Sequence, residues 1–394
     1  MSEFLLELYS EEIPPQLQIN ARNQLKHYLK KSLDEYGIKH KELLEFSNST
    51  RLSVYIKGIT EKIKIKSNEI KGPKVGVEKN ILENFMKSRK VSEKELFQKE
   101  TDKGKFYFIK TKEQNLFASD ILIDILPKAI SSINWKKSMK WSTNEMMWGR
   151  PLRAIFSIFN GKKLPFKFQH LETVDYVVVE QDLNIKSKKI KNFNDYYSFL
   201  KTNRIFIDQT ERKKIIIKKF SSFFNSKNYK EKYNENLLEE VVNIVENPNV
   251  LLVHFDKEYL KIPEEIIIST LEKHQRYFPI FDSRDRLTNY FFVVANKKDE
   301  NKIITEGNKS VVEARLSDAK FFWEKDRSKN LIKLIGNLKK ITFYEKLGTI
   351  FDKTQRLKNL AALLSDELNI NKEKVQVAAS ISKSDLCSDL VGEY

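Results

Sequence analysis

The chain has 394 residues, and its 71 Lys and Arg against 54 Asp and Glu give a formal net charge of +17 at pH 7. This length predicts two or three domains, and an apolar share of 40% is enough to build their cores. No apolar run approaches the roughly 18 residues of a membrane span, no secretion signal follows Met1, and the single cysteine, Cys387, excludes an internal disulfide. We therefore expect a cytoplasmic protein without membrane contact.

Residues 1–60 predict a first α+β unit. A strand is expected over 4–9, and the turn at Pro14-Pro15 opens a long helix. Side chains at helical spacing define the buried face of this helix: Ala21, Leu25, Tyr28, Leu29, Ser32 and Tyr36. Gly37 is placed to end the helix in the left-handed conformation. Two strands are expected next, over 43–46 and 52–59, and the second alternates as a half-buried strand does.

Residues 61–225 predict a second α+β region that begins with a basic arm. The stretch 61–79 is poor in apolar residues and contains Gly72 and Gly76, so we expect a loop there. The further elements are expected in this order: a strand over 106–110, a helix over 118–133 interrupted by Pro127, a hairpin over 153–168 with a type I′ turn at Asn160-Gly161, a polar segment over 180–203, and a basic helix from Asp208.

Residues 226–330 predict a helix-hairpin-helix unit, which begins with a polar loop or domain boundary at 226–236. The elements expected after it are a helix from Pro263 to about Tyr277, paired strands over 278–281 and 290–295, and a helix after Asn308 with the stripe Val312, Leu316, Ala319 and Trp323. Over 331–394 the pattern is helical and still runs at Tyr394, so we expect a truncated all-helical domain of a longer polypeptide. The expected fold class is multidomain α+β.

The positive charge favours a polyanionic partner, because each phosphate that is neutralised releases counterions. Nucleic acid is the leading candidate. The alternative is that the excess of Lys, beside abundant Ile and Asn, reflects only a genome rich in A and T. The charge alone leaves both interpretations open.

A first candidate contact combines cations with aromatic rings over 134–141 and 150–153. Rings between cations suit stacking on bases together with phosphate contact. The alternative is that Trp135 and Trp141 are core anchors on either side of a basic turn. The cations that we select here as RNA contacts are Lys137, Lys140, Arg150 and Arg153.

A second candidate contact lies at the end of the helix that begins at Pro263. Lys273 and Arg276 are three residues apart and therefore neighbours on a helix, with His274 and Tyr277 on the next ridge. Such an edge suits an RNA backbone or an unstacked base. The alternative is that Tyr277 belongs to the core and the cations form a solvated rim.

The sequence shows no pattern for catalysis or for a bound cofactor. The adjacent carboxylate pairs do not share a helix face, so they make poor acid and base dyads. The five histidines are scattered, and neither a Gly-x-Gly-x-x-Gly motif nor a Walker lysine loop occurs. We therefore expect no catalytic residue, no metal ligand and no bound ATP on this chain.

A series of short motifs resembles the β subunit of bacterial two-subunit glycyl-tRNA synthetase. These motifs are Ser10 to Pro15, Gly72-Pro73, Lys137 to Trp141, Arg150-Pro151, Glu239 to Val242, Glu246 to Pro248, Ile262 to Glu265, His274 to Pro279, Gly307 to Lys309, Ala314 to Phe322, Ser382 to Leu386, and Val391 to Tyr394. The chain departs from the family at Ser49-Thr50-Arg51-Leu52, where a proline and two arginines are typical.

The resemblance implies ATP-dependent attachment of glycine to tRNA(Gly), with the active site on a separate α subunit. It implies that this chain binds tRNA(Gly) without catalysing the reaction, that ATP and Mg²⁺ are substrates at the α subunit, and that the assembly is an α2β2 hetero-tetramer. Residues 331–394 would be the start of an HD-like helical domain. Two alternatives stay open, an HD-type metal-dependent phosphohydrolase and a general RNA-binding assembly module.

Overall fold

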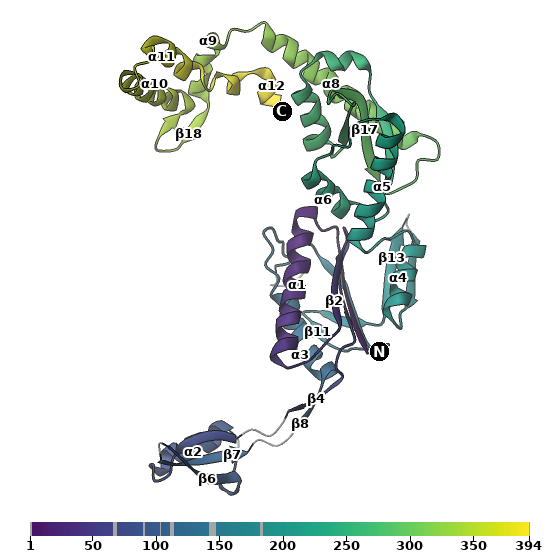
Figure 1. Ribbon diagram of the computed structural model, residues 1–394, viewed down its shortest axis with the longest axis vertical. Helices are drawn as coiled ribbons and strands as arrows, with labels where there is room; N and C mark the ends of the chain where they lie inside the picture. The colour runs from purple at the N-terminus through teal and green to yellow at the C-terminus, as the bar shows by residue number, and fades with distance from the viewer. Residues whose placement is uncertain are drawn as a thin grey trace. The chain divides into compact units, whose positions relative to one another are not determined.

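A computed structural model describes residues 2–65, 69–89, 91–102, 104–110, 114–141, 147–181 and 184–393. The chain forms two compact units (Figure 1). Unit 1 comprises Met1–Arg212 and Val242–Asn247, and unit 2 comprises Lys213–Val241 and Pro248–Tyr394. Both units combine helices with sheets, which confirms the expected α+β class. The division into four domains at 60, 225 and 330 stays a prediction.

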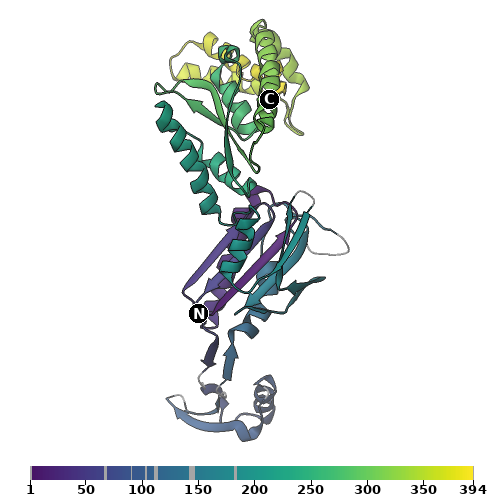
Figure 2. The same ribbon diagram turned by 90° about the vertical axis from the view of Figure 1, so that its right-hand side faces the viewer.

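Unit 1 is built on one mixed sheet, which has seven strands among the described residues, in the order β11-β12-β9-β1-β3-β2 with β10 beside β9. The strands are β1 (Glu3–Ser10), β2 (Glu42–Ser47), β3 (Arg51–Lys57), β9 (Leu152–Phe159), β10 (Lys162–Lys163), β11 (Lys167–Phe168) and β12 (Leu171–Val174). The central strand β1 is antiparallel to both β3 and β9, whereas β12 is parallel to β9. Figure 2 shows the long strands side by side.

Both faces of this sheet are covered. On one face Phe4, Leu6 and Leu8 pack against the helices α1 (Pro15–Glu35) and α3 (Ala118–Ser131). On the other face Leu5 packs with side chains of β13 (Tyr176–Gln181) and α4 (Phe193–Thr202). The prediction of a half-buried strand over 52–59 is therefore wrong, because six consecutive residues of β3 are buried. Burial of one large apolar side chain stabilises the fold by about 1.5–3 kcal/mol.

Helix α1 begins and ends where the sequence predicts. Pro15 occupies the first helical position, where a missing N–H costs nothing. Gly37 has a φ of +71°, and the N–H of Ile38 returns to the carbonyl of Leu33 at 2.9 Å. The helix ends at Glu35, so the predicted buried position of Tyr36 is wrong, and 43% of this residue is exposed.

The expected basic loop over 61–79 is largely strand, which corrects that prediction. β4 (Lys62–Ile65) pairs with β8 (Gln114–Phe117), and β5 (Glu69–Lys74) joins β7 (Gly104–Lys110) and β6 (Leu96–Thr101) in a small sheet. The helix α2 (Lys79–Arg89) packs on it, since a Cβ at Gly72 would lie 2.8 Å from the Phe85 ring. The lysines of β4 and β5 alternate with only a few apolar residues, which conceals the strand pattern. A 3-10 turn, η1 (Glu93–Glu95), precedes β6.

The turn at Asn160-Gly161 is confirmed, with φ values of 49° and 73° between β9 and β10. β11 pairs with β12 and not with β9, so the predicted hairpin is shorter than 153–168. The polar segment 180–203 also contains regular structure, because β14 (Asn184–Lys189) pairs with β13 and the side chain of Asn192 caps α4.

Unit 2 contains a three-stranded antiparallel sheet in the order β15-β17-β16. Its strands are β15 (Asn249–His254), β16 (Phe278–Phe281) and β17 (Leu287–Ala295). The helix α8 (Ile303–Arg327) packs on it through Val312, Leu316 and Ala319, which confirms that part of the predicted stripe. The chain passes from one unit to the other within α5 (Gln209–Lys227), within α6 (Glu235–Ile244) and again between Asn247 and Pro248. The predicted loop before α6 spans 228–234.

The helix predicted over 263–277 is shorter and irregular. α7 (Glu264–Ser269) follows the 3-10 turn η2 (Lys257–Lys261) and continues as one π-helical turn, Thr270–His274. The region after 331 is mainly helical, but a hairpin of β18 (Thr342–Tyr344) and β19 (Gly348–Thr349) interrupts it. The other elements there are α9 (Leu331–Leu334), η4 (Ile335–Lys340), α10 (Ile350–Glu367), α11 (Lys372–Ile381), η5 (Ser384–Cys387) and α12 (Asp389–Glu393).

Candidate nucleic-acid interface

The basic turn after α3 is fixed to α1. The N–H of Asn134 donates to Oε1 of Gln24 at 2.9 Å, and Nε2 of Gln24 donates to the carbonyl of Asn134 at 3.2 Å. Trp135 is buried and meets Trp148 edge-on, with 5.0 Å between the ring centroids. Trp135 is therefore a core anchor, which confirms the core interpretation for this residue. Lys137 and Lys140 are exposed.

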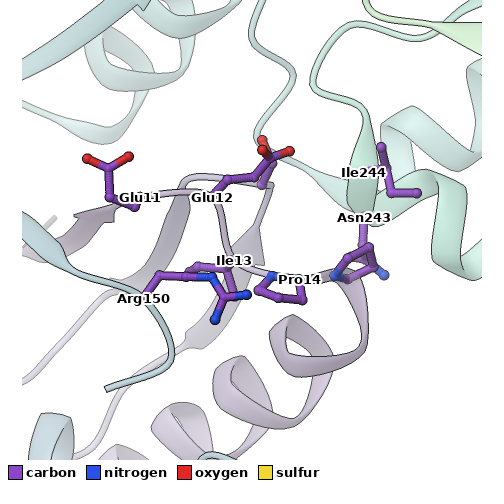
Figure 3. A pocket seen from close by; sticks show the side chains of 9 residues that line it. Glu11, Glu12, Ile13, Pro14, Arg150, Asn243 and Ile244 are labelled. Atoms are coloured by element: carbon purple, nitrogen blue, oxygen red, sulfur yellow. The ribbon is translucent and has the colours of Figure 1, made fainter. Parts of the chain in front are cut away.

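Arg150 lies beside an open hollow of about 470 Å³ in unit 1 (Figure 3). The lining residues are Glu11, Glu12, Ile13, Pro14, Pro15, Ser49, Arg150, Asn243 and Ile244. In this view the carboxylates of Glu11 and Glu12 point away from the guanidinium of Arg150, which donates to the carbonyl of Gly149 at 2.8 Å. Because two carboxylates line this hollow, it is unfavourable for binding a polyanion.

Arg153 on β9 is neutralised within unit 1. Its Nη1 lies 2.7 Å from Oε2 of Glu180, and its Nε lies 3.5 Å from Oε1 of Glu11. The hydrogen bond to Glu180 raises the pKa of Arg153 above its ordinary value. The guanidinium also lies over the ring of Tyr9. Its charge already has partners, so Arg153 is the weakest of the four selected cations as a phosphate contact.

In unit 2 the second cluster surrounds the π-helical turn. Lys273 is exposed, whereas Nε of Arg276 pairs with Oε1 of Glu240 at 3.2 Å and its Nη1 donates to the carbonyl of Lys273. Burial and the nearby charges of Arg315, Lys273 and Arg276 lower the pKa of His274. Tyr277 stacks on Phe291 with 5.4 Å between the centroids, and burial raises its pKa. The core interpretation of Tyr277 is thus confirmed.

The sequence prediction missed a buried ion pair in the central sheet. Arg51 on β3 and Glu7 on β1 are each 2% exposed, with 3.2 Å between Nε of Arg51 and Oε2 of Glu7. Tyr196 donates to the same carboxylate oxygen at 2.7 Å. Although burial disfavours its charge, Glu7 and Glu246 hold the pKa of Arg51 above its ordinary value. The sequence signal that could have indicated this ion pair is a charged residue between apolar neighbours in a predicted strand.

Arg212 is a second buried cation that serves the fold. It donates to the carbonyls of Val242 at 2.9 Å, Ile207 at 3.0 Å, Ser47 at 2.7 Å and Phe206 at 2.5 Å. Burial lowers the pKa of Arg212 to about 10. These bonds join three separate stretches of unit 1, so this charge is unavailable to a ligand.

The described ranges contain neither a metal-binding cluster nor a membrane-spanning helix. No group of three or more His, Cys, Asp or Glu side chains there is placed to hold a metal ion. No helix in the same ranges is both long and apolar enough to cross a bilayer.

Comparison with known proteins identifies the family. Residues 4–394 match a family of aminoacyl-tRNA synthetase subunits, the one described as glycyl-tRNA synthetase beta subunit. The chain belongs to this glycyl-tRNA synthetase beta subunit family. It is 34% identical over 406 residues to the glycine–tRNA ligase beta subunit of Clostridioides difficile and 34% identical over 397 residues to that of Rickettsia felis. These matches cover 100% of this chain and 59% of each relative.

Proposed function

We propose that this chain is the tRNA-holding part of a glycine–tRNA ligase β subunit, and that a separate α subunit performs the ATP-dependent glycylation of tRNA(Gly). The observation that carries the proposal is the family match over residues 4–394. The name of the family also implies a partner subunit, and we propose an α2β2 assembly in the cytoplasm. In this assembly ATP and Mg²⁺ act as substrates at the α subunit, and this chain binds no cofactor.

The charge distribution supports a holding role. Exposed lysines such as Lys137, Lys140 and Lys273 can each contact a phosphate, and such contacts position a nucleic acid without reading its sequence. Holding tRNA in a fixed orientation converts an encounter between two molecules into a step within one complex. The chain therefore contributes to catalysis through orientation, while the partner supplies the reacting groups.

The test is reconstitution. The full-length protein and a glycyl-tRNA synthetase α subunit are purified separately, and glycylation of tRNA(Gly) is measured for each alone and for the mixture. We expect activity only in the mixture. A mixture that stays inactive and does not associate contradicts the proposal.

The same preparation separates the two alternatives. Metal-stimulated release of phosphate from nucleotides by the full-length protein alone favours the phosphohydrolase. Equal binding of tRNA and unrelated RNA over a range of salt concentrations, without α-subunit association, favours the general RNA-binding module.

A further inference from the structure

A second hollow of unit 1 differs in charge from the one beside Arg150. It has a volume of about 370 Å³ and is lined by Asn23, Gln24, His27, Tyr28 and Ser132, so its lining contains no carboxylate. By contrast, Glu11 and Glu12 line the hollow beside Arg150, and Glu83 and Glu93 line one on α2. Of these three hollows, the one on α1 is the most compatible with a negatively charged ligand.

The groups in this hollow are those that recognise an unstacked base. Asn23 and His27 are four residues apart on α1, so both project from one side of the helix, and both are exposed. Tyr28 packs against the core of unit 1, which holds its ring in place. Aromatic rings stack on unpaired RNA bases, and an amide side chain supplies both a donor and an acceptor for a base edge.

Three exposed lysines lie close in sequence to residues that line the hollow or hold it in place. Lys128 precedes the lining residue Ser132 by one helical turn, and Lys136 and Lys137 follow it in the basic turn. Gln24 lines the hollow and also holds that turn through its two bonds to Asn134. The buried ring of Trp135 fixes the turn from the other side. The turn that contains Lys136 and Lys137 is thus bound to a residue of the hollow before any ligand binds.

We propose that this hollow takes one unpaired base of the bound RNA, while Lys136 and Lys137 contact the phosphates that flank it. The inference rests on the proposed function and deepens it, because it names the part of the RNA that is bound. Tyr28 and His27 stack on the base, and Asn23 bonds to its edge. An acidic peptide would suit the lysines but would leave the fixed ring and the amide without a matching group.

Binding of tRNA(Gly) to the full-length protein in complex with its α subunit tests the inference. The variants are Asn23→Ala and Tyr28→Leu, with Asn80→Ala on α2 and Tyr36→Leu at the end of α1 as matched controls. We expect roughly ten-fold weaker binding for each hollow variant. The slope of log affinity against log salt should stay unchanged in them, because no charge is lost, whereas Lys136→Ala should reduce this slope by about 1.

The outcomes separate this inference from the proposed function. If the wild-type complex does not bind tRNA(Gly), the proposed function fails. If it binds and the exposed-site variant Asn23→Ala matches its control, the inference fails. A photocrosslink from 4-thiouridine at unpaired positions of the tRNA to residues 23–30 supports the inference. Crosslinks only elsewhere in the chain contradict it, even if Tyr28→Leu weakens binding by disturbing the fold.

Discussion

At the scale of single residues, the charges of this chain fall into buried and exposed groups with opposite roles. Arg51 and Arg212 are buried and interact with protein acceptors, whereas Lys137, Lys140 and Lys273 are exposed. The sequence neighbours do not separate these groups, because Arg212 between Glu211 and Lys213 has the same polar surroundings as Lys137 between Lys136 and Ser138. The structure assigns Arg51 to stability, at the position where the chain departs from the family pattern.

Removal of one partner of the buried pair is expected to be costly. Arg51→Ala leaves the carboxylate of Glu7 buried without its cation, so we expect the free energy of unfolding to fall by about 3–5 kcal/mol. The double variant Glu7→Leu, Arg51→Met removes both charges and should lose less than the single variant. Chemical denaturation of the full-length protein measures both changes. A double variant less stable than Arg51→Ala would show that the pair itself stabilises the sheet.

At the scale of elements, several segments with a clear apolar pattern were predicted correctly, whereas the apolar strands β13 and β15 and several lysine-rich strands were missed. The helices α1 and α3 and the strands β1, β16 and β17 carry clear apolar patterns, and the structure confirms each of them. The strands β4, β5 and β14 were missed because lysines occupy most of their exposed positions. The π-helical turn at Thr270–His274 was missed because an extra residue in one helical turn leaves no compositional signal.

For the candidate site, too, the sequence predicted the local features and not the packing between distant residues. Sequence could predict that the turn over 134–141 is basic, and Lys137 and Lys140 are exposed as that requires. It could not decide whether Trp135 faces bases or the core, since that depends on packing against Trp148 after an intervening turn, which has no local sequence pattern. The hollow on α1 is lined by residues of α1 together with Ser132 at the end of α3, an arrangement between distant parts of the chain that no local pattern indicates.

The short helix α12 gives a prediction at this scale. Asp326, at the end of α8, accepts from the N–H groups of Asp389 at 2.9 Å and Leu390 at 2.8 Å. Burial by itself would raise the pKa of Asp326, but these two N–H groups and Lys329 bring it below its ordinary value. Asp326→Asn should weaken the docking of α12 by about 1 kcal/mol. Hydrogen exchange of the α12 amides measures the change.

The pH dependence of this contact has a definite sign. A carboxyl whose pKa is lowered by folding contributes stability above its unfolded value of about 3.9, and this contribution is lost as the pH falls through the lower folded value. Protection of α12 should therefore decline in acid in the wild type and change less in Asp326→Asn. Asp366→Asn is the control, because its pair with Lys372 is exposed and surface pairs contribute little. Equal effects of both variants would contradict the capping role.

At the scale of the whole molecule, the sequence was enough to predict the family. It was not enough to predict which subunit of the assembly binds the tRNA and which performs the reaction. Short motifs spread over the chain resembled one family, and the match over residues 4–394 confirms that resemblance. The tRNA contacts and the α-subunit partner stay predictions, because a net charge of +17 indicates attraction to polyanions without locating it.

Salt dependence tests that attraction for the full-length protein in complex with its α subunit. Each phosphate contact contributes about −0.7 to −0.9 to the slope of log affinity against log salt. The triple variant Lys137→Ala, Lys140→Ala, Lys273→Ala should therefore reduce the magnitude of the slope for tRNA(Gly) by about 2–3. Arg153→Ala is the matched control and should change the slope little, because Glu180 and Glu11 already neutralise this cation. A larger change from Arg153→Ala than from the triple variant would place the phosphates on β9 and overturn this assignment of the lysines.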